Sequence, residues 1–350
     1  NPKPGSTSTW YGLAEDAWKA PFATNASATD FHAYTIGNWL FPDGDPAILH
    51  DSAHYYLAFA QSWLAAGFDK PGHWGECSLY TTNYAEHPQL AADTNGVWLH
   101  KWIWARSGAA FVYPTYWNAE NVFAYDLHHL YGNWNRFMAG IPAANSRYRD
   151  AAASSADPRL RFAGQKDIPR GHAYLWIDNR NHTWKNVVDG VPVAPVSAAV
   201  QIPMSRPGAN YAVTRFDTAT GLPAAQTNVA ADTNGIVQLT VSGLASDTAL
   251  QLQLSGESDW DGDGDGLPDQ WEARYVNDLD LIDASTDLDG DGFPDAGEFI
   301  AGTAPADPAS LLLLLDTASG LFWPAASNRT YRIERSENLT NDGWEVFQDA

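Results

Sequence analysis

Two acidic stretches of twelve residues, 261–272 and 287–298, constrain this chain more than any other feature. In each stretch, carboxylate side chains occupy positions 1, 3, 5, 9 and 12, and a glycine occupies position 6. Carboxylates at alternate residues converge on one point only where the chain turns sharply, and Gly266 and Gly292 permit such a turn. A hard dication takes six to eight oxygen ligands, so this spacing predicts one cation site in each stretch.

The spacing is that of the twelve-residue EF-hand calcium loop. In such a loop the Glu at position 12 supplies two oxygens, and position 7 supplies its backbone carbonyl. A solvated acidic linker is the alternative interpretation, but two full matches in tandem favour calcium as a cofactor. The predicted calcium ligands are Asp261, Asp263, Asp265, Leu267, Asp269 and Glu272 in the first loop, and Asp287, Asp289, Asp291, Phe293, Asp295 and Glu298 in the second.

The negative charge of the chain is concentrated around these loops. Of the formal net charge of −22, residues 257–307 contribute −15, because they hold 16 acidic side chains and only Arg274 as a base. A charge distribution of this kind argues against a nucleic-acid partner. Cys77 is the only cysteine, so the chain has no internal disulfide, and weak calcium loops suit millimolar extracellular calcium. We therefore expect a secreted or cell-surface protein, without a run of eighteen apolar residues to span a membrane.

The hydrophobic patterns divide the chain into five segments and predict a multidomain protein. Residues 1–145 alternate short apolar strands with amphipathic helices, which is typical of parallel β/α units. Residues 146–165 are predicted to be a polar linker. Residues 166–256 contain five short strands separated by turns, which predicts an antiparallel β-sandwich. Residues 257–310 hold the calcium loops, and residues 311–350 look like the start of a further β module.

Strands and helices alternate in the first segment. Asp45 is a predicted N-cap, with Pro46 in the first turn of the helix that follows it. The expected strands are 5–10, 30–35, 70–77 and 109–117, and the expected helices run from 46 to about 66, from 93 to 106 and from 125 to 138.

Glu76 is the candidate catalytic residue, because it ends a strand in a β/α region. The carboxyl ends of the strands build the active site of a β/α barrel, so residues there face substrate. A carboxylate at such a point can attack an anomeric carbon while a second acid about 5 Å away protonates the leaving oxygen. His32 and Trp117 end the flanking strands. By residue type alone, Glu76 is also compatible with a solvated loop, His32 with a structural histidine and Trp117 with the core.

These strand ends resemble the second half, strands five to eight, of the (β/α)8 barrel of retaining glycoside hydrolases of the cellulase-like superfamily. The resemblance lies in residues 30–34 for strand six, 70–76 for strand seven and 108–117 for strand eight. It implies that Glu76 is the nucleophile. It also implies that His32 and Tyr34 line the site, and that Trp117 forms the floor under the bound sugar.

The chain departs from this family in one respect. The family's acid/base Glu ends strand four, usually after an Asn, and no residue of this chain matches it. We therefore expect the chain to be a fragment that holds half of the active site, with its acid/base residue upstream, and to show negligible hydrolysis alone.

The later segments carry resemblances of their own. The predicted sandwich is similar, at residues 173–186 and 211–221, to the domain that follows such barrels in secreted bacterial glycosidases. Its Trp176 and Trp184 are expected to pack in a core rather than to bind glycan. The calcium segment resembles the thrombospondin type 3-like spacers of large secreted bacterial proteins. Dockerins also pair two such loops, but they usually lack Glu at position 12 and have a longer helix after each loop.

The predicted function is that of a fragment of a secreted retaining glycoside hydrolase that acts on a β-linked polysaccharide and contains a calcium-stabilised spacer. Two alternatives stay open. One is a non-catalytic, calcium-dependent carbohydrate-binding or adhesion protein, and the other is a dockerin-like scaffold component that a protein partner captures. The chain ends in what looks like the middle of a strand, so attachment to a cell surface or scaffold is expected to involve a region beyond residue 350.

Overall fold

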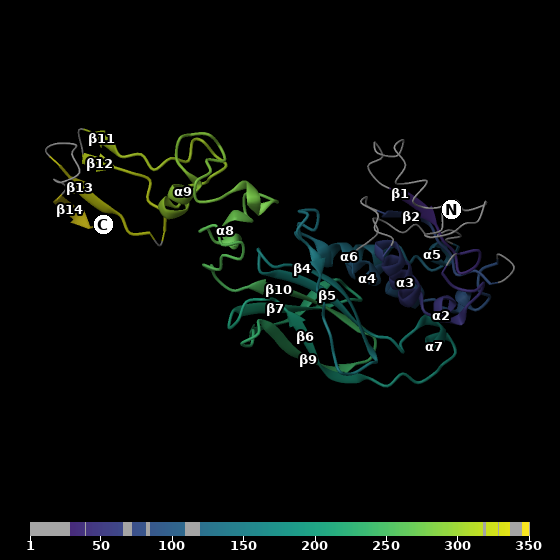
Figure 1. The fold of residues 1–350 in the computed structure, drawn as a ribbon. Helices are drawn as coiled ribbons and strands as arrows, with labels where there is room; N and C mark the ends of the chain where they lie inside the picture. The colour runs from purple at the N-terminus through teal and green to yellow at the C-terminus, as the bar shows by residue number, and fades with distance from the viewer. Residues whose placement is uncertain are drawn as a thin grey trace. The chain divides into compact units, whose positions relative to one another are not determined.

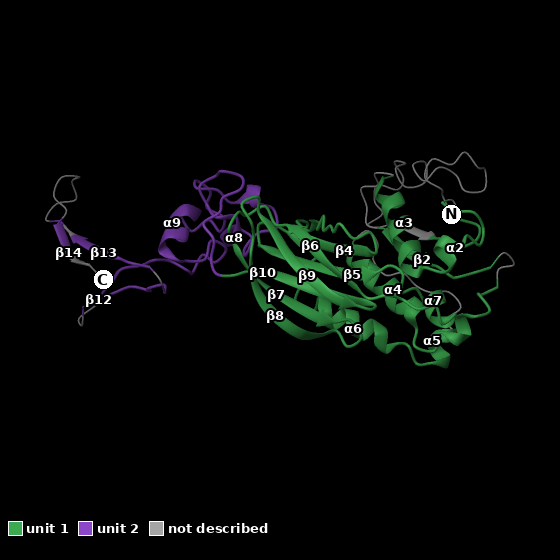
Figure 2. Ribbon diagram, turned by 90° about the horizontal axis from the view of Figure 1, so that it is seen from below, with its two compact units in different colours: residues 1–255 green, residues 256–350 purple. Residues whose placement is uncertain are grey.

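The computed structural model describes residues 29–38, 40–65, 72–81, 85–108, 120–317, 320–327, 329–336 and 345–349. The chain divides into two compact units, unit 1 (Asn1–Ser255) and unit 2 (Gly256–Ala350), which Figure 2 distinguishes by colour. Among the described residues, no helix is long and apolar enough to cross a membrane.

Unit 1 begins, within the described residues, with one parallel β–α–β unit. Strand β1 (Thr29–His32) pairs in parallel with β2 (Gly72–Glu76), and helices α2 (Pro46–Leu49) and α3 (Ser52–Ala65) connect them (Figure 1). The parallel pairing predicted for these strands is confirmed. One strand pair does not establish a barrel, so the (β/α)8 barrel stays a prediction.

The connecting helix begins as the sequence predicts and then breaks. The Asp45 carboxylate accepts a hydrogen bond from the Ala47 amide at 2.8 Å, and Pro46 occupies the first turn. The single predicted helix is two helices, because Asp51 starts a second cap by accepting from the His54 amide at 3.1 Å.

The other two predicted helices are observed, but each starts later than predicted. Helix α4 (Val97–Ala105), followed by a 3-10 turn η3 (Arg106–Gly108), corresponds to the helix predicted at 93–106, and a separate 3-10 turn η2 (Leu90–Ala92) precedes it. The Asp93 carboxylate accepts from the Val97 and Trp98 amides and thereby caps α4. Helix α6 (His129–Met138) corresponds to the helix predicted at 125–138, and a separate helix α5 (Glu120–Ala124) precedes it. The strands predicted at 5–10 and 109–117 lie outside the described residues.

The rest of unit 1 contains two antiparallel sheets. The larger has the strand order β3–β4–β5–β10–β7–β8, and the smaller pairs β6 with β9. All five strands predicted between 166 and 256 are confirmed, as β5, β6, β7, β9 and β10. The bounds are β3 (Arg149–Asp150), β4 (Leu160–Asp167), β5 (His172–Asn179), β6 (Val196–Pro203), β7 (Asn210–Asp217), β8 (Leu222–Ala230), β9 (Ile236–Leu244) and β10 (Asp247–Leu254), with a short helix α7 (Trp184–Val188) after β5.

The predicted linker at 146–165 is wrong. Strand β3 lies within it, and β4 pairs with β5 along its whole length, from Leu160 opposite Asn179 to Asp167 opposite His172. Part of the polar character of this segment is buried charge: Arg161 of β4 is buried and pairs with Asp51 and Asp178. Strand β8 was not predicted, because it is an edge strand whose side chains are almost all exposed.

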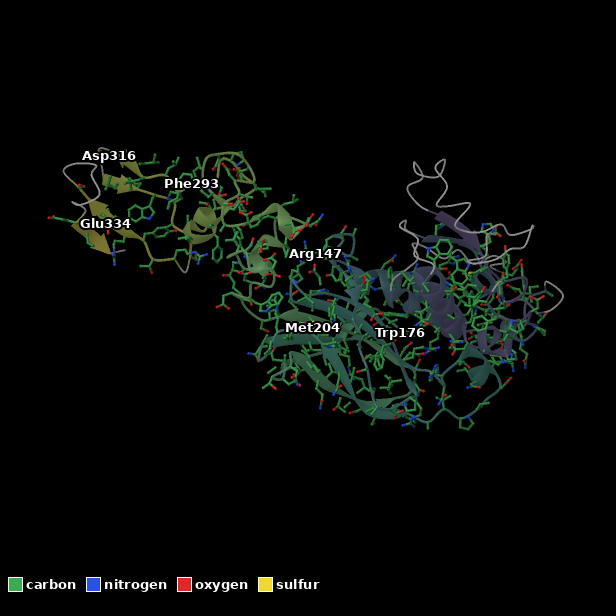
Figure 3. All side chains as sticks on the ribbon, viewed as in Figure 1. Arg147, Trp176, Met204, Phe293, Asp316 and Glu334 are labelled. Carbon is green, nitrogen blue, oxygen red and sulfur yellow. The ribbon has the colours of Figure 1, made fainter. Side chains whose placement is uncertain are left out.

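Strand β5 shows how unit 1 is layered, because both of its faces are buried. Leu175 and Ile177 join the hydrophobic cluster that the larger sheet shares with β6 and β9. Tyr174 and Trp176 alternate with them and join the second cluster, which contains the side chains of α3 and α4 (Figure 3). Trp176 and Trp184 are both fully buried, which confirms their predicted packing role.

Unit 2 has little regular structure. Its calcium segment contains α8 (Asp269–Glu272), a 3-10 turn η4 (Leu279–Leu281) and α9 (Asp295–Ala301) around a small cluster of Leu267, Trp271 and Ile282. In this segment the sequence predicts a helix only at 270–278, and the observed α8 is shorter. Two antiparallel pairs follow, β11 (Leu315–Thr317) with β12 (Gly320–Phe322) and β13 (Arg332–Arg335) with β14 (Glu345–Asp349).

Candidate functional site

The structure brings together three of the four residues predicted to form a sugar site. Because β1 and β2 are parallel, their carboxyl ends lie at the same edge, and the register places His32 opposite Glu76. The Nδ1 atom of His32 is 3.2 Å from Oε2 of Glu76, and the Tyr34 hydroxyl donates a hydrogen bond to the same oxygen. The fourth residue, Trp117, lies outside the described residues.

The backbone at Glu76 is anchored in the core although its side chain faces outward. The Trp74 indole donates to the Glu76 carbonyl at 2.8 Å, and the Ala33 amide donates to the same carbonyl at 3.0 Å. Trp74 is fully buried, whereas the Glu76 side chain is 25% exposed. The carboxylate is thus accessible on a rigid support, and sequence reasoning missed this role of Trp74.

The surroundings of Tyr34 keep its hydroxyl protonated, so that it donates a hydrogen bond. Burial raises the pKa of the Tyr34 phenol, and its hydrogen bond to Glu76 raises it further. The Tyr80 ring stacks on Tyr34 with 5.5 Å between centroids, which orients the phenol. Burial also raises the pKa of the neighbouring Cys77 thiol, and the charge of Glu76 adds to this effect, so Cys77 is a poor nucleophile.

This arrangement suits a carboxylate that must attack. Both contacts with described residues involve Oε2, and no described residue donates a hydrogen bond to Oε1. A carboxylate fixed through one oxygen and open at the other can act as a nucleophile toward an electrophilic carbon.

The second candidate site lies in unit 2, where the predicted calcium ligands converge. In the first loop, ligand atoms of Asp261, Asp263 and Asp265 lie within 4.8 Å of one another, and so do those of Asp263, Asp269 and Glu272. In the second loop the same holds for Asp287, Asp289 and Asp291.

The two loops have the same backbone turn. The amides of Gly264 and Gly266 donate to Asp261 at 2.6 and 3.0 Å, and the corresponding amides of the second loop donate to Asp287. Gly266 and Gly292 have φ values of 100° and 97°, which side chains rarely adopt. The sharp turn predicted at position 6 is confirmed.

The position 12 carboxylates are buried and have no basic partner among the described residues. Glu272 is 0% exposed and Glu298 is 1% exposed. No described residue makes a well-aligned hydrogen bond to any of their four carboxylate oxygens, although the Thr303 hydroxyl lies close enough to Glu298 to lower its pKa. Burial raises the pKa of Glu272 to about 8, and the nearby carboxylates, Asp265 first, add to the increase. Burial likewise raises the pKa of Glu298 to about 7. A buried carboxylate without a partner is costly unless a cation joins it, so these residues fit a bound dication.

The other predicted ligands differ in how they are held. Asp269 and Asp295, at position 9, are buried and accept hydrogen bonds from the Gly262 and Leu288 amides, respectively. Both therefore help to close their loops. Asp269 also faces the first site, whereas Asp295 and Glu298 are not among the converging carboxylates of the second loop. At position 7, the Leu267 side chain lies in the small core, whereas Phe293 is exposed.

No protein-family model matches the sequence, and no curated protein matches it either. Similar solved structures are glycoside hydrolases. They include a family 44 endoglucanase from Clostridium acetobutylium ATCC 824, with 12% identity and a TM-score of 0.30 over 57% of this chain and 35% of that one. A glucosidase from Croceicoccus marinus matches with 10% identity and a TM-score of 0.31 over 66% of this chain and 54% of that one.

A third similar structure is a family 44 xyloglucanase from Paenibacillus polymyxa, with 13% identity and a TM-score of 0.31 over 58% of this chain and 36% of that one. The chain thus spans between about a third and about half of the length of these enzymes. At such low TM-scores the likeness does not support a function for this chain.

Proposed function

We propose that the chain is part of a retaining glycoside hydrolase in which Glu76 is the nucleophile. The observation that carries this proposal is the placement of a partly exposed carboxylate at the carboxyl end of β2, with the Tyr34 hydroxyl and the His32 ring against one of its oxygens. The β-linked polysaccharide substrate is part of the same proposal and follows from the resemblance of residues 30–34 and 70–76. The secreted or cell-surface location is also proposed, and it follows from the calcium loops and the single cysteine.

In the proposed reaction the Glu76 carboxylate attacks the anomeric carbon. A C–O bond forms between Glu76 and the sugar while the bond to the leaving oxygen breaks, and a second acid supplies the proton to that oxygen. Water then releases the sugar from Glu76. The raised pKa of Tyr34 keeps its proton in place, so the phenol holds Oε2 throughout and leaves Oε1 for the attack.

A mechanism-based label tests this role of Glu76. A 2,4-dinitrophenyl 2-deoxy-2-fluoro-β-glycoside has a leaving group that departs without a proton, so labelling needs the nucleophile but no acid. We expect the natural full-length protein to gain one fluoroglycosyl group on the peptide that contains Glu76, and the Glu76→Gln variant to gain none. Glu86→Gln is the matched control, and it should be labelled like the unmodified protein. Hydrolysis of β-glycosides by an unlabelled protein, or by Glu76→Gln, would rule out the assignment.

A second proposed function is calcium binding by residues 261–272 and 287–298. The burial of Glu272 without a partner supports it, because a bound dication would neutralise this carboxylate. When bound, calcium supplies a centre of charge that holds each loop closed. The helices that begin at position 9 of the two loops have only four and seven residues, which favours a spacer over a dockerin-like module.

Calorimetric titration of the calcium-free chain tests this second proposal. We expect two binding events per chain, of which Glu272→Gln weakens one and Glu298→Gln the other. Glu257→Gln, which changes an exposed Glu outside both loops, is the control. Absence of calcium uptake at millimolar calcium would contradict the proposal.

A further inference from the structure

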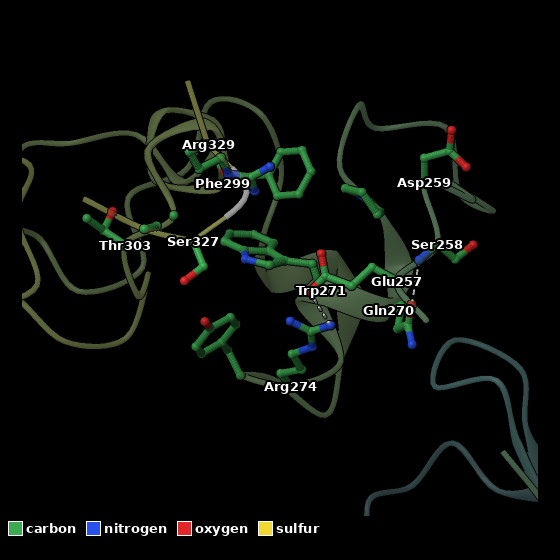
Figure 4. A pocket seen from close by; sticks show the side chains of 14 residues that line it. Glu257, Ser258, Asp259, Gln270, Trp271, Arg274, Phe299, Thr303, Ser327 and Arg329 are labelled. Atoms are coloured by element: carbon green, nitrogen blue, oxygen red, sulfur yellow. Dashed lines mark hydrogen bonds and ion pairs between the residues drawn. The ribbon is translucent and has the colours of Figure 1, made fainter. Parts of the chain in front are cut away.

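Unit 2 contains a pocket that the calcium ligands do not fill (Figure 4). Its volume is about 640 Å³, within the usual range for small-molecule sites. Trp271, Arg274 and Tyr275 line one side, and Phe299 and Arg329 line another. The pocket therefore combines aromatic rings with planar charged groups.

The aromatic side chains form one connected wall. The Trp271 and Tyr275 rings have centroids 5.3 Å apart, and the Trp271 and Phe299 rings have centroids 5.4 Å apart, both edge to face. Tyr275 is 36% exposed, so it offers a flat apolar face and a hydroxyl to a ligand.

The two arginines are oriented by their neighbours and still reach solvent. Arg274 is paired with Glu257 at 3.2 Å, and its side chain is 44% exposed. The Arg329 guanidinium donates to the Phe299 carbonyl at 2.8 Å and lies 5.3 Å from the Phe299 ring. Each guanidinium has five N–H donors, so both keep donors for a ligand.

The charges around the pocket narrow the class of ligand. The strong negative charge of residues 257–307 repels anions, and the two arginines in the wall repel cations. A neutral ligand is favoured. An exposed aromatic face beside guanidinium, carboxylate and hydroxyl groups suits a ring with one apolar face and hydroxyls along its edge. We propose that this pocket binds a pyranose unit of a neutral oligosaccharide.

The geometry of the pocket is linked to the calcium loops. Trp271 precedes Glu272 in the first loop, and Phe299 follows Glu298 of the second loop. A cation that fixes Glu272 and Glu298 therefore also fixes the aromatic wall. This site lies wholly in unit 2 and goes beyond the proposed hydrolysis, which uses Glu76 of unit 1.

The test measures binding of cellotetraose and xylotetraose to the 350-residue chain in saturating calcium, by calorimetry and ligand-observed NMR. We expect Tyr275→Ala and Arg329→Ala each to lower the affinity for the bound oligosaccharide roughly tenfold. The matched controls are Phe123→Ala, an exposed aromatic in unit 1, and Arg332→Ala, an exposed arginine of unit 2. Both controls should bind as the unmodified chain does. Calcium titration of each variant shows whether its loops remain intact.

Two further binding measurements distinguish this site from the Glu76 site. Glu76→Gln should leave the affinity unchanged, and chelation of calcium should lower it. If neither oligosaccharide binds, or if binding survives both pocket variants, the proposal is overturned. If Glu76→Gln abolishes binding, the sugar occupies unit 1, which overturns the unit 2 site and leaves the proposed hydrolase intact.

Discussion

Both units bury carboxylates, but among the described residues basic partners for buried carboxylates are found in unit 1 and not in unit 2. Asp178 is fully buried between Lys101 and Arg161, at 2.5 Å from each. Despite its burial, His100 and Lys101 hold the pKa of Asp247 well below its usual range. In unit 2, Glu272 and Glu298 are buried as deeply, and no described residue pairs with either carboxylate.

The hydrophobic core is also larger in unit 1 than in unit 2. Unit 1 contains two extensive clusters, one between the sheets and one under the helices. The calcium segment has three buried apolar residues in its cluster. From this difference we propose that unit 1 is stabilised by its own contacts, whereas unit 2 depends on a bound cation to complete its structure.

The largest expected effect comes from removing calcium, because it separates the two units most sharply. At free calcium 100 times the dissociation constant, each loop gains about 2.7 kcal/mol, or about 5 kcal/mol for two independent loops. We expect chelation to expose unit 2 to proteases, with cleavage between residues 256 and 310, while unit 1 stays resistant. Equal protease sensitivity of unit 2 with and without calcium would contradict the proposed dependence of unit 2 on a cation.

The second effect targets the ion pairs of unit 1. Asp178→Ala removes the carboxylate that Lys101 and Arg161 share and leaves these buried cations with only Asp247 and Asp51, respectively, so we expect the free energy of unfolding of unit 1 to fall by about 3 kcal/mol. Urea denaturation measures this change, and calcium affinity should not alter. Asp157→Ala, which removes a partly exposed ion pair with Arg159, should have a much smaller effect. Equal losses in the two variants would show that burial is not the cause.

The third effect is a pH dependence of unit 1 from His172. Burial lowers the pKa of His172 to about 4, and the Tyr148 hydroxyl makes a hydrogen bond with its Nδ1 at 2.7 Å. The unfolded chain, with an ordinary pKa near 6.5, takes up the proton first as the pH falls. Stability from this group is therefore complete above pH 6.5 and is lost, by about 3 kcal/mol, as the pH falls toward 4.

Denaturation of the unmodified chain and of His172→Gln at pH 7.5 and pH 4.5 measures this contribution. The variant lacks the titrating ring, so its loss of unfolding free energy between pH 7.5 and pH 4.5 should be smaller than that of the unmodified chain, by most of the about 3 kcal/mol. His129→Gln changes an exposed histidine of the same unit and should behave like the unmodified chain. An unchanged acid loss in His172→Gln would contradict the assignment.

The smallest expected effect tests whether Glu272 of unit 2 is a calcium ligand. Glu272→Gln removes one buried negative charge, so we expect the calcium affinity of the first loop to fall roughly tenfold, about 1.4 kcal/mol. The calcium-free form should become more stable, because the repulsion between Glu272 and the neighbouring carboxylates is lost. Thermal unfolding in chelator should show the increased stability of the calcium-free variant, and unfolding in calcium should show the reduced stabilisation by the bound ion. A variant destabilised under both conditions would mean that Glu272 is structural rather than a ligand.

The strand ends illustrate which parts of the candidate sites could be predicted. The positions of Glu76 and His32 at the ends of two neighbouring strands follow from short apolar runs, and the parallel register confirms that they face each other. The support under Glu76 was not predictable, because Trp74 reaches the Glu76 carbonyl through a side chain that looks like ordinary core. The helix at 46–66 was too long in the prediction because the second cap at Asp51 was overlooked.

The turns at Gly266 and Gly292 and the alternating strands could be predicted because their signals are local: acidic residues at fixed spacing, glycine at the turn, and apolar residues at every second position. The structure of residues 146–165 and the pairing of the charges of β4 could not be predicted, because they depend on residues far away in the sequence. Arg161 looks like a linker residue until its partner Asp51, 110 positions earlier, closes a buried ion pair with it. A charged side chain becomes a core residue only when the fold supplies its counter-ion, and no local pattern records where that ion comes from.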